Sequence, residues 1–414
     1  MKTNVKEYDH FRVHTIKKDN YKKCAIEIHC REKINKDNLG KVKALFDLLN
    51  RGTKSYPSIK ELSKRKEYLY GLVSLCYDST NGDIIDGVVY AEFLNPKYVD
   101  DKNYLNDVIK FVFDYIKEPL LTEKDLKLIK EEQKLSLKHK EEELFSKAFK
   151  EAKSTIETSY GLSAFNTEEE IDKLTIEDLK ETLKDIINNY TIDIYVIGNL
   201  DMNEVEKIIV DNSPFINNKL SKLEFDYHVK HRTVKELENK GKFEQSMIIY
   251  FYSFENLSRK QRLYEATLLS DVLGSGLNSL LYKDIREKHS LCYNLSAVYM
   301  RHTNILMITV GVDKKNIAKT KERIEDIMSN LNTLINKDNV SDARLNIISN
   351  IEQNTDSIDY LLFESDAVFN NVIDPMDLKL KRFSEITEDS IKAILPNMKE
   401  YTKYVLVGDK NENN

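Results

Sequence analysis

The chain has 414 residues, of which 41% are hydrophobic and 32% charged, and its formal net charge is −6. This length is too great for one ordinary hydrophobic core, so we expect at least two domains, and the composition excludes a disordered chain. The negative charge gives no general reason to bind nucleic acid, and the sequence has no apolar run long enough to predict a membrane-spanning helix.

The first twenty residues lack an apolar stretch, so we expect no secretory signal. The four cysteines, Cys24, Cys30, Cys76 and Cys292, form no CxxC motif. Unpaired cysteines without a signal indicate a cytoplasmic protein.

Strands and helices mix in the first half of the chain. Alternating apolar residues predict two strands, at 11–18 and 21–30, joined at Asp19-Asn20. Helical periodicity or a glycine stop predicts the following helices: 40–50, closed by Gly52; 58–71; 104–117; a charged region at roughly 123–158; and 167–188. Two strands precede the helix at 104–117, and an apolar strand at 191–201 closes this half.

The second half repeats this order. After a polar join at 202–240, a strand at 247–254 leads to two helices, the first ended by Gly274 and Gly276, and then to two more strands. The last strand, YTKYVLVGDK, is similar to TIDIYVIGNLD at the end of the first half. We therefore predict an α+β fold with two duplicated domains, at 1–220 and 221–414. Each should contain a mostly antiparallel sheet packed with several long helices.

Two short stretches carry a resemblance to a known family. LGSGLNSLLYKDIREKHSLCY, residues 273–293, resembles a signature in the second domain of insulinase-like, pitrilysin-type metallopeptidases, which include the mitochondrial processing peptidases and bacterial relatives. In the first half, LFDLLNRGTKSYP resembles the zinc-binding helix of that family and the Gly-Thr that follows it. With the duplication, the resemblance covers essentially the whole chain.

The resemblance fails at the metal ligands. Active members carry H-x-x-E-H on the first helix, where two histidines bind zinc and the glutamate is the general base. Counted back from Gly52, the histidine positions hold Lys43 and Asp47, and the glutamate position holds Phe46. Residues 31–60 contain no histidine, so no shift of register restores the motif. We expect no zinc and no catalytic residue in this chain.

Other metal or nucleophile sites are less well supported. A third zinc ligand in active members is a glutamate on a later helix, and the residues available in that region are Glu131, Glu132, Glu141, Glu142 and Glu143. Without the histidines these read as a solvated helix face. His228 and His231 lie three residues apart but have no cysteine or clear acidic partner.

Arg286 and Tyr293 are the candidate substrate-binding residues. They lie seven residues apart, across a change from helical to strand periodicity. In the family, the equivalent residues reach the cleft near the zinc, bind the substrate backbone and stabilise the oxygen that gains charge. The alternative is that Arg286 pairs with a carboxylate and that Tyr293 packs in the core.

The resemblance implies a division of labour between paired subunits. The leading hypothesis is a non-catalytic, substrate-binding subunit of a heterodimeric zinc peptidase, which pairs with a zinc-bearing paralogue and binds peptide along a sheet edge. The bacterial branch is linked to peptide processing or, by name, to elongation factor P modification. A structural scaffold and a stand-alone zinc peptidase with unorthodox ligands remain as alternatives.

Overall fold

The computed structural model describes residues 3–217, 220–276, 278–353, 355 and 357–409. These form two compact units, each built from more than one stretch of chain. Unit 1 contains Met1–Leu137, Ser163–Phe225 and Asp356–Val372, and unit 2 contains Lys138–Leu162, Asp226–Thr355 and Ile373–Asn414. The predicted domain boundary near residue 220 stays a prediction, because units that are compact in space do not show where a duplicated sequence divides.

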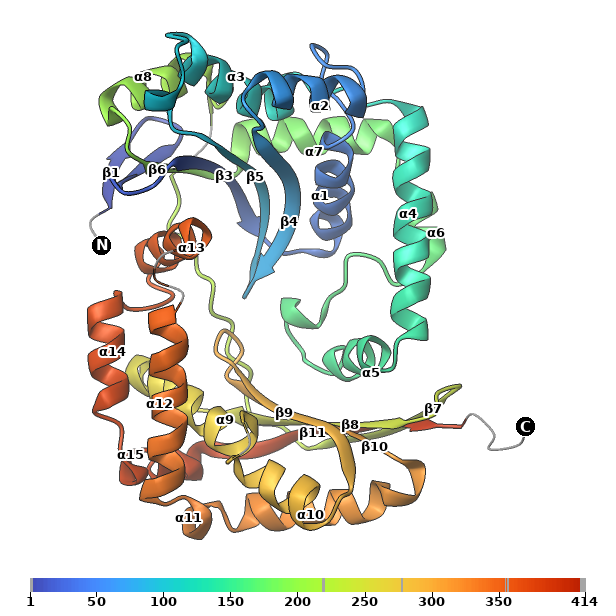
Figure 1. Cartoon of the computed structure of the whole chain (residues 1–414). Helices are drawn as coiled ribbons and strands as arrows, with labels where there is room; N and C mark the ends of the chain where they lie inside the picture. The colour runs from blue at the N-terminus through green and yellow to red at the C-terminus, as the bar shows by residue number, and fades with distance from the viewer. Residues whose placement is uncertain (1–2, 218–219, 277, 354, 356, 410–414) are drawn as a thin grey trace. The chain divides into compact units, whose positions relative to one another are not determined.

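Unit 1 contains a six-stranded sheet in the order β1-β2-β6-β3-β5-β4 (Figure 1). Its strands are β1 (Asn4–Glu7), β2 (Arg12–Lys17), β3 (Lys23–Lys33), β4 (Val73–Asn81), β5 (Ile84–Leu94) and β6 (Thr191–Gly198). Its helices are α1 (Lys36–Leu49), α2 (Ile59–Tyr68), α3 (Tyr104–Lys117), most of α4 (Glu123–Glu142), α6 (Glu168–Asp172), α7 (Ile176–Asn189), α8 (Met202–Asn212) and α13 (Ile358–Phe369).

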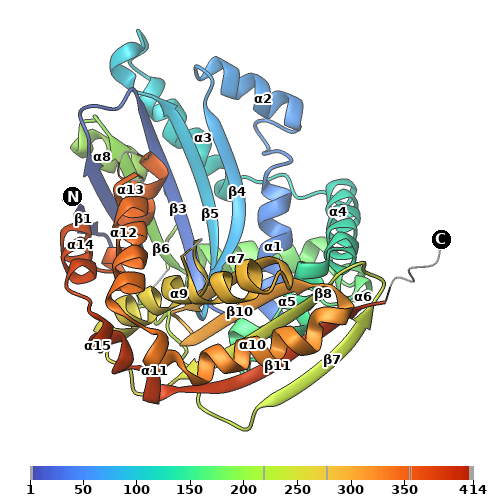
Figure 2. The same ribbon diagram turned by 60° about the horizontal axis from the view of Figure 1, so that its bottom comes forward.

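Unit 2 contains a five-stranded sheet in the order β7-β11-β8-β10-β9 (Figure 2). Its strands are β7 (Lys235–Gly241), β8 (Ser246–Phe254), β9 (Cys292–Met300), β10 (Ile305–Val312) and β11 (Met398–Gly408). Its helices are α5 (Leu144–Lys153), α9 (Ala266–Gly274), α10 (Ile317–Ser329), α11 (Leu331–Leu334), α12 (Lys337–Gln353), α14 (Met376–Ser384) and α15 (Glu388–Lys392), with wider helical turns at Gln261–Glu265 and Tyr282–Lys288.

The two sheets share one topology, which confirms the predicted α+β class with duplicated domains. The strand order is the same in both sheets. After the extra edge strand β1, the sheet of unit 1 (sheet 1) runs β2-β6-β3-β5-β4, and the sheet of unit 2 (sheet 2) runs β7-β11-β8-β10-β9. In each sheet one pair is parallel, β2 with β6 and β7 with β11, and every other pair is antiparallel. The similar closing strands of the two halves, β6 and β11, occupy equivalent positions.

The structure corrects two local predictions and adds detail to a third. The strands predicted at 11–18 and 21–30 are not neighbours, because β6 lies between β2 and β3. The join predicted to be irregular contains α8 and β7, and all residues of β7 except Gly241 are exposed, which hides its strand pattern. The charged helical region predicted at roughly 123–158 is confirmed; it forms two helices, α4 and α5, and α5 packs in unit 2.

Each sheet is covered on one face by a helix that comes from the other half of the sequence. Helix α13 packs against sheet 1, where Leu361 and Leu362 meet Tyr195 and Ile197. Helix α5 packs against sheet 2, where Ala148 and Ala152 meet a cluster that includes Ile249 and Phe251 of β8. Burial of these apolar side chains is the main force that holds both helices in place.

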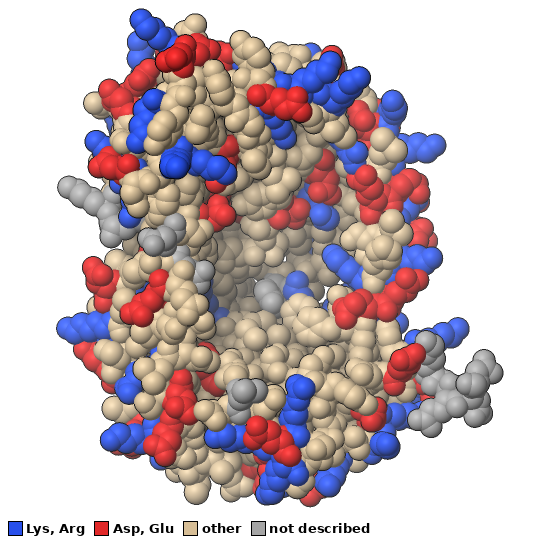
Figure 3. All heavy atoms as spheres, in the orientation of Figure 1, with Lys and Arg blue, Asp and Glu red and all other residues tan. Residues whose placement is uncertain are grey.

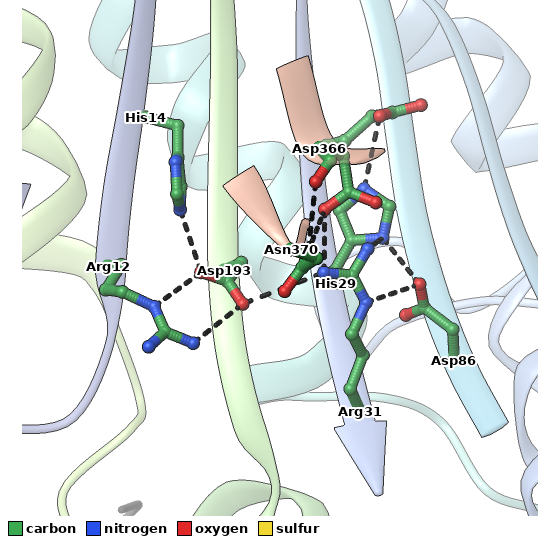
Figure 4. A network of polar contacts seen from close by, with 9 residues as sticks. Arg12, His14, His29, Arg31, Asp86, Asp193, Asp366 and Asn370 are labelled. Atoms are coloured by element: carbon green, nitrogen blue, oxygen red, sulfur yellow. Dashed lines mark hydrogen bonds and ion pairs between the residues drawn. The ribbon is translucent and has the colours of Figure 1, made fainter. Parts of the chain in front are cut away.

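Charged groups also hold α13 on sheet 1, in a network that is almost wholly buried (Figure 4). Arg31 of β3 is 1% exposed, and its guanidinium donates to Asp86 of β5 at 2.8 Å and to Asp366 of α13 at 2.8 Å. Asp366 also accepts from Asn370 at 2.9 Å. One arginine therefore joins two strands of the sheet to a helix that is 335 residues away in sequence.

The rest of the network extends along the same face of the sheet. Arg12 binds Asp193 through two hydrogen bonds of 2.7 and 3.0 Å, and His14 contacts the same carboxylate at 2.8 Å. Burial opposes the ionised form of Asp193, but His14 and Arg12 hold its pKa well below its usual range. Buried charges that are paired in this way avoid the large cost of an isolated charge.

His29 lies between two carboxylates, with Nδ1 2.7 Å from Asp86 and Nε2 3.2 Å from Glu27. Burial alone would lower the pKa of His29, but the charge of Asp86 and the two hydrogen bonds raise it to about 10. Arg31 Nη2 also lies 2.8 Å from Nδ1 of His29, and the charge of Arg31 opposes part of this rise in pKa.

The exposed charges are distributed differently. On the face shown in Figure 3, the Lys and Arg side chains of each unit are interspersed with Asp and Glu, and neither sign dominates. No described helix is long and apolar enough to cross a membrane.

The first prediction concerns the ion pair that anchors α13. Asp366→Ala leaves Arg31 buried without this partner, so it should reduce the free energy of unfolding by about 3–5 kcal/mol in urea denaturation. Asp359→Ala, at the exposed start of the same helix, removes only the bond from the Tyr90 hydroxyl and should cost at most about 1 kcal/mol. Equal effects of the two substitutions would contradict the anchoring role.

The second prediction concerns pH. The pKa of His29 is raised to about 10, above about 6.5 for an unfolded histidine, so its contribution to stability is complete below pH 6.5 and declines as the pH rises towards 10. The decline should not exceed about 1.4 kcal/mol per pH unit. Urea denaturation from pH 6.5 to 10 measures it, and His29→Gln should remove this dependence. An unchanged slope in the variant would show that another group is responsible.

Candidate functional site

Helix α1 carries the three positions where the zinc motif would lie. Asn35 caps its start, because its side chain accepts from the N–H groups of Asp37 and Asn38. The helix extends from Lys36 to Leu49 and agrees with the helix predicted at 40–50. Lys43 and Asp47 are one turn apart and share one side of α1, as the motif histidines would.

The ammonium of Lys43 lies between two carboxylates. Its Nζ atom is 3.4 Å from Asp47 Oδ2 and 3.4 Å from Asp78 Oδ1 of β4. Burial alone would lower the pKa of Lys43, but Asp78 and Asp47 raise it. Burial raises the pKa of Asp78, and Lys43 opposes that shift. Lys43, at one histidine position of the motif, thus places a positive charge beside Asp47, at the other histidine position.

Phe46 takes the position of the catalytic glutamate and is buried, with 1% of its surface exposed. Its ring packs on Gly87 of β5 so closely that a Cβ at residue 87 would lie 2.2 Å from ring carbons. This position therefore forms part of the contact between α1 and the sheet, and its side chain has no group that takes up a proton.

Gln133 of α4 is the residue that faces Asp47, and the sequence analysis missed it. Its Nε2 atom donates to Asp47 Oδ2 at 3.0 Å, and the side chain is 6% exposed. The considered glutamates lie elsewhere: Glu132 binds Arg51, Glu131 and Glu142 are largely exposed, and Glu141 and Glu143 bind Lys150 and the start of α5. The sequence did contain a signal for Gln133, because Leu126, Ile129 and Gln133 lie on one face of α4, and this is the buried face of the helix.

The residues present do not fit a zinc ion. An ammonium, a phenyl ring and a neutral amide replace groups that would ligate the metal or activate water. Among the described residues no group of three or more His, Cys, Asp or Glu side chains is arranged to hold a metal. No hydrolytic step can be derived from this part of the chain.

Arg286 and Tyr293 lie on either side of a tight turn in unit 2. Ser290 has a φ of 52°, and the N–H groups of Ser290 and Leu291 donate to the carbonyls of Arg286 and Ile285. Arg286 is exposed, lies over the Tyr282 ring at 5.3 Å and forms no ion pair with a described carboxylate. The alternative in which Arg286 forms a carboxylate pair is therefore not seen in the described residues.

Tyr293 is 51% exposed at the start of β9, and its hydroxyl donates to Asp313 at 2.9 Å. This hydrogen bond raises the pKa of Tyr293. The side chain is therefore not a core residue, but its donor already has a partner. The roles of Arg286 and Tyr293 in substrate binding remain predictions.

His228 and His231 do not share a site. The ring of His228 faces Asp226 at 3.3 Å, whereas His231 Nδ1 lies 2.8 Å from the Ser253 hydroxyl. His302 and Arg262 also contact Asp226, at 2.8 and 3.4 Å. Burial opposes ionisation of Asp226, but His228 and His302 hold its pKa well below its usual range. With Arg262 on the same carboxylate, this cluster is a charge network and not a metal centre.

Comparison with known proteins identifies relatives for most of the chain. The sequence profile of the family described as "Peptidase M16 inactive domain" matches residues 173–351. The "Probable inactive metalloprotease YmfF" of Bacillus subtilis (strain 168) is 22% identical over 312 residues, 73% of each chain. The "Non-peptidase homolog YmxG" of Helicobacter pylori (strain ATCC 700392 / 26695) is 22% identical over 304 residues, 71% of this chain and 67% of the relative.

Solved structures share the fold. A conserved protein from Enterococcus faecalis V583 superimposes with a TM-score of 0.92 at 18% identity, covering 99% of this chain and 100% of the other. At this identity the likeness supports the fold, whereas the sequence relatives support the family.

The third prediction tests the metal positions. The isolated wild-type protein should contain no stoichiometric zinc by elemental analysis. Lys43→His, Phe46→Glu and Asp47→His together should not give an efficient peptidase, because residue 46 packs against Gly87 and Gln133 supplies no anionic ligand.

Adding Gln133→Glu to the triple variant should tighten zinc binding by at least about tenfold, because a carboxylate replaces an amide facing position 47. Glu131→Gln in the same background is the matched control and should not change zinc affinity. Chelator-sensitive hydrolysis by the triple variant alone would contradict the prediction.

Proposed function

From the premise that this chain is a homologue of the inactive M16-type peptidases, we propose that it is the non-catalytic, peptide-binding subunit of a heterodimeric zinc peptidase. The family resemblance predicted from residues 45–57 and 273–293 is confirmed by the profile match and the two relatives. In this proposal the zinc belongs to a paralogous partner subunit, and the complex processes peptides in the cytoplasm.

The observation that carries the proposal is the contrast between the two signatures. Lys43, Phe46 and Asp47 have lost metal chemistry, whereas Arg286 and Tyr293 are kept, exposed and joined by a tight turn. An exposed guanidinium without a carboxylate partner offers several donors to peptide carbonyls.

A structural scaffold is the second candidate, and one observation favours it. The Tyr293 hydroxyl already donates to Asp313, so it must leave that carboxylate before it can donate to a peptide. A stand-alone zinc peptidase with unorthodox ligands has no support in the arrangement around Lys43.

The fourth prediction concerns the partner. Purified gently from the native cell, the chain should be recovered with a second subunit of similar size that carries an intact H-x-x-E-H motif and one zinc. We expect the interface to exceed about 1,600 Å² of total buried surface, as obligate complexes usually do. Size exclusion with multi-angle light scattering tests this, and a monomer recovered alone in repeated preparations would contradict it.

The fifth prediction concerns Arg286 and Tyr293 in the reconstituted pair. Arg286→Ala and Tyr293→Phe should each leave folding and partner binding nearly intact while reducing peptidase activity. A donor to the developing oxyanion typically contributes about 100- to 1,000-fold in turnover. Loss of a donor that only binds ground-state peptide should instead raise mainly the Michaelis constant, since a charged donor contributes about 1.5–3 kcal/mol to binding.

The matched control is Lys283→Ala, an exposed cation on the preceding helical turn. It should leave both kinetic constants unchanged. If both test variants also leave turnover and the Michaelis constant unchanged, the peptide-binding role is rejected and the scaffold role is favoured.

A further inference from the structure

Strand β4 is the last strand of sheet 1 and pairs only with β5. The outer side of such a strand presents N–H and C=O groups of alternate residues, and these can accept an added strand. On β4 the outward-facing residues are Ser74, Cys76 and Asp78, as the contacts below show. This edge lies beside α1, as both Figure 1 and Figure 2 show.

Asn50, at the end of α1, pairs with the outer edge of β4 through its carboxamide. Its Oδ1 atom accepts from the Cys76 N–H at 2.9 Å, and its Nδ2 atom donates to the Cys76 carbonyl at 2.7 Å. Nδ2 also donates to the Phe46 carbonyl at 3.0 Å, which holds the amide in place. One donor and one acceptor on the same strand residue are what the main chain of an added strand would supply.

The flanking outward positions are also engaged by side chains of this chain. Lys66, near the end of α2, donates to the Ser74 carbonyl at 3.2 Å, and burial lowers the pKa of Lys66. Lys43 lies 3.4 Å from the Asp78 carboxylate. Main-chain groups of β4 are therefore engaged at Cys76 and Ser74, whereas Asp78 is contacted through its side chain.

The equivalent strand of unit 2 differs. Strand β9 is the edge strand of sheet 2, and between Cys292 and Tyr299 no side chain of the described residues hydrogen-bonds to its main chain. The end of α9 approaches it at Ala297, where a Cβ on Gly274 would lie 2.4 Å from the Ala297 nitrogen. The segment before Ala297, which starts beside Tyr293, is not closed in this way.

We propose that Asn50 closes the β4 edge by standing in for a peptide group, so that this chain takes an extended peptide on the β9 edge of unit 2 and not on the β4 edge of unit 1. The proposal rests on the proposed peptide-binding function and specifies its surface. It predicts that the two duplicated sheets, which share one strand order, differ in which edge accepts a main chain.

The experiment follows backbone amide hydrogen exchange of the full chain, with and without a short unstructured peptide of alternating apolar and polar residues. In the wild type, peptide should slow exchange in β9 and leave β4 unchanged. In Asn50→Ala, exchange at Cys76 should become faster without peptide, and added peptide should then slow exchange in β4 as well. Peptide affinity should rise about tenfold, because two main-chain hydrogen bonds become available.

Asn212→Ala is the matched control, because Asn212 also ends a helix but donates only to the Ile208 carbonyl of its own helix. It should behave as the wild type does. A peptide N-methylated at alternate positions should lose the effect in β9, because it lacks the donors that strand addition needs. Thermal melts of both variants confirm that each is folded.

The outcomes separate this proposal from the proposed function. Slower exchange in β4 of the wild type would overturn the closed edge while supporting peptide binding. No peptide effect in the wild type, together with a gain in β4 of Asn50→Ala, would uphold the closed edge and reject peptide binding by this chain. No peptide effect on β4 in Asn50→Ala would overturn the role of Asn50.

Discussion

The buried guanidinium of Arg31 is the contact on which unit 1 depends. It joins β3 to β5 through Asp86 and to α13 through Asp366, and the nearby Asp193 carboxylate lies 3.7 Å away. A buried arginine without these carboxylates would cost several kcal/mol, so the helix and the sheet each supply what the other needs. The apolar contacts of Leu361 and Leu362 stabilise the same interface.

The exchange of α5 and α13 gives a physical reason why neither half of the sequence forms its unit alone. One face of each sheet is covered by a helix from the opposite half, and both faces of a buried sheet must be covered. The contacts that hold the covering helix differ between the two units. In unit 1 a buried charged network around Arg31 joins α13 to the sheet. In unit 2, α5 packs on an apolar cluster that includes Ala152 and Phe251, and Glu151 of α5 accepts from the Tyr404 hydroxyl of β11.

In α1, the residues at the positions that match the zinc motif form structural contacts. Lys43 supplies a permanent positive charge between Asp47 and Asp78, in place of an exchangeable cation, and Phe46 adds an apolar contact with Gly87. Asn50, one turn later, satisfies main-chain groups of β4. Lys43, Phe46 and Asn50 thus each form a contact between α1 and the sheet. In unit 2, Arg286 and Tyr293 are both exposed.

The sequence by itself determined the features that depend on local pattern. The periodicity of 104–117 and the Gly52 stop defined helices, the two similar closing strands revealed the duplication, and the lack of histidine in residues 31–60 removed the zinc motif. Tertiary structure alone decided which distant residues meet. Gln133 faces Asp47 across 86 residues and Asp366 reaches Arg31 across 335, because pairing at such separations is set by how the sheets and helices pack and leaves no mark on local periodicity. It also placed β6 between β2 and β3, since a parallel neighbour is chosen by the whole sheet and not by the short turn that joins two strands in sequence.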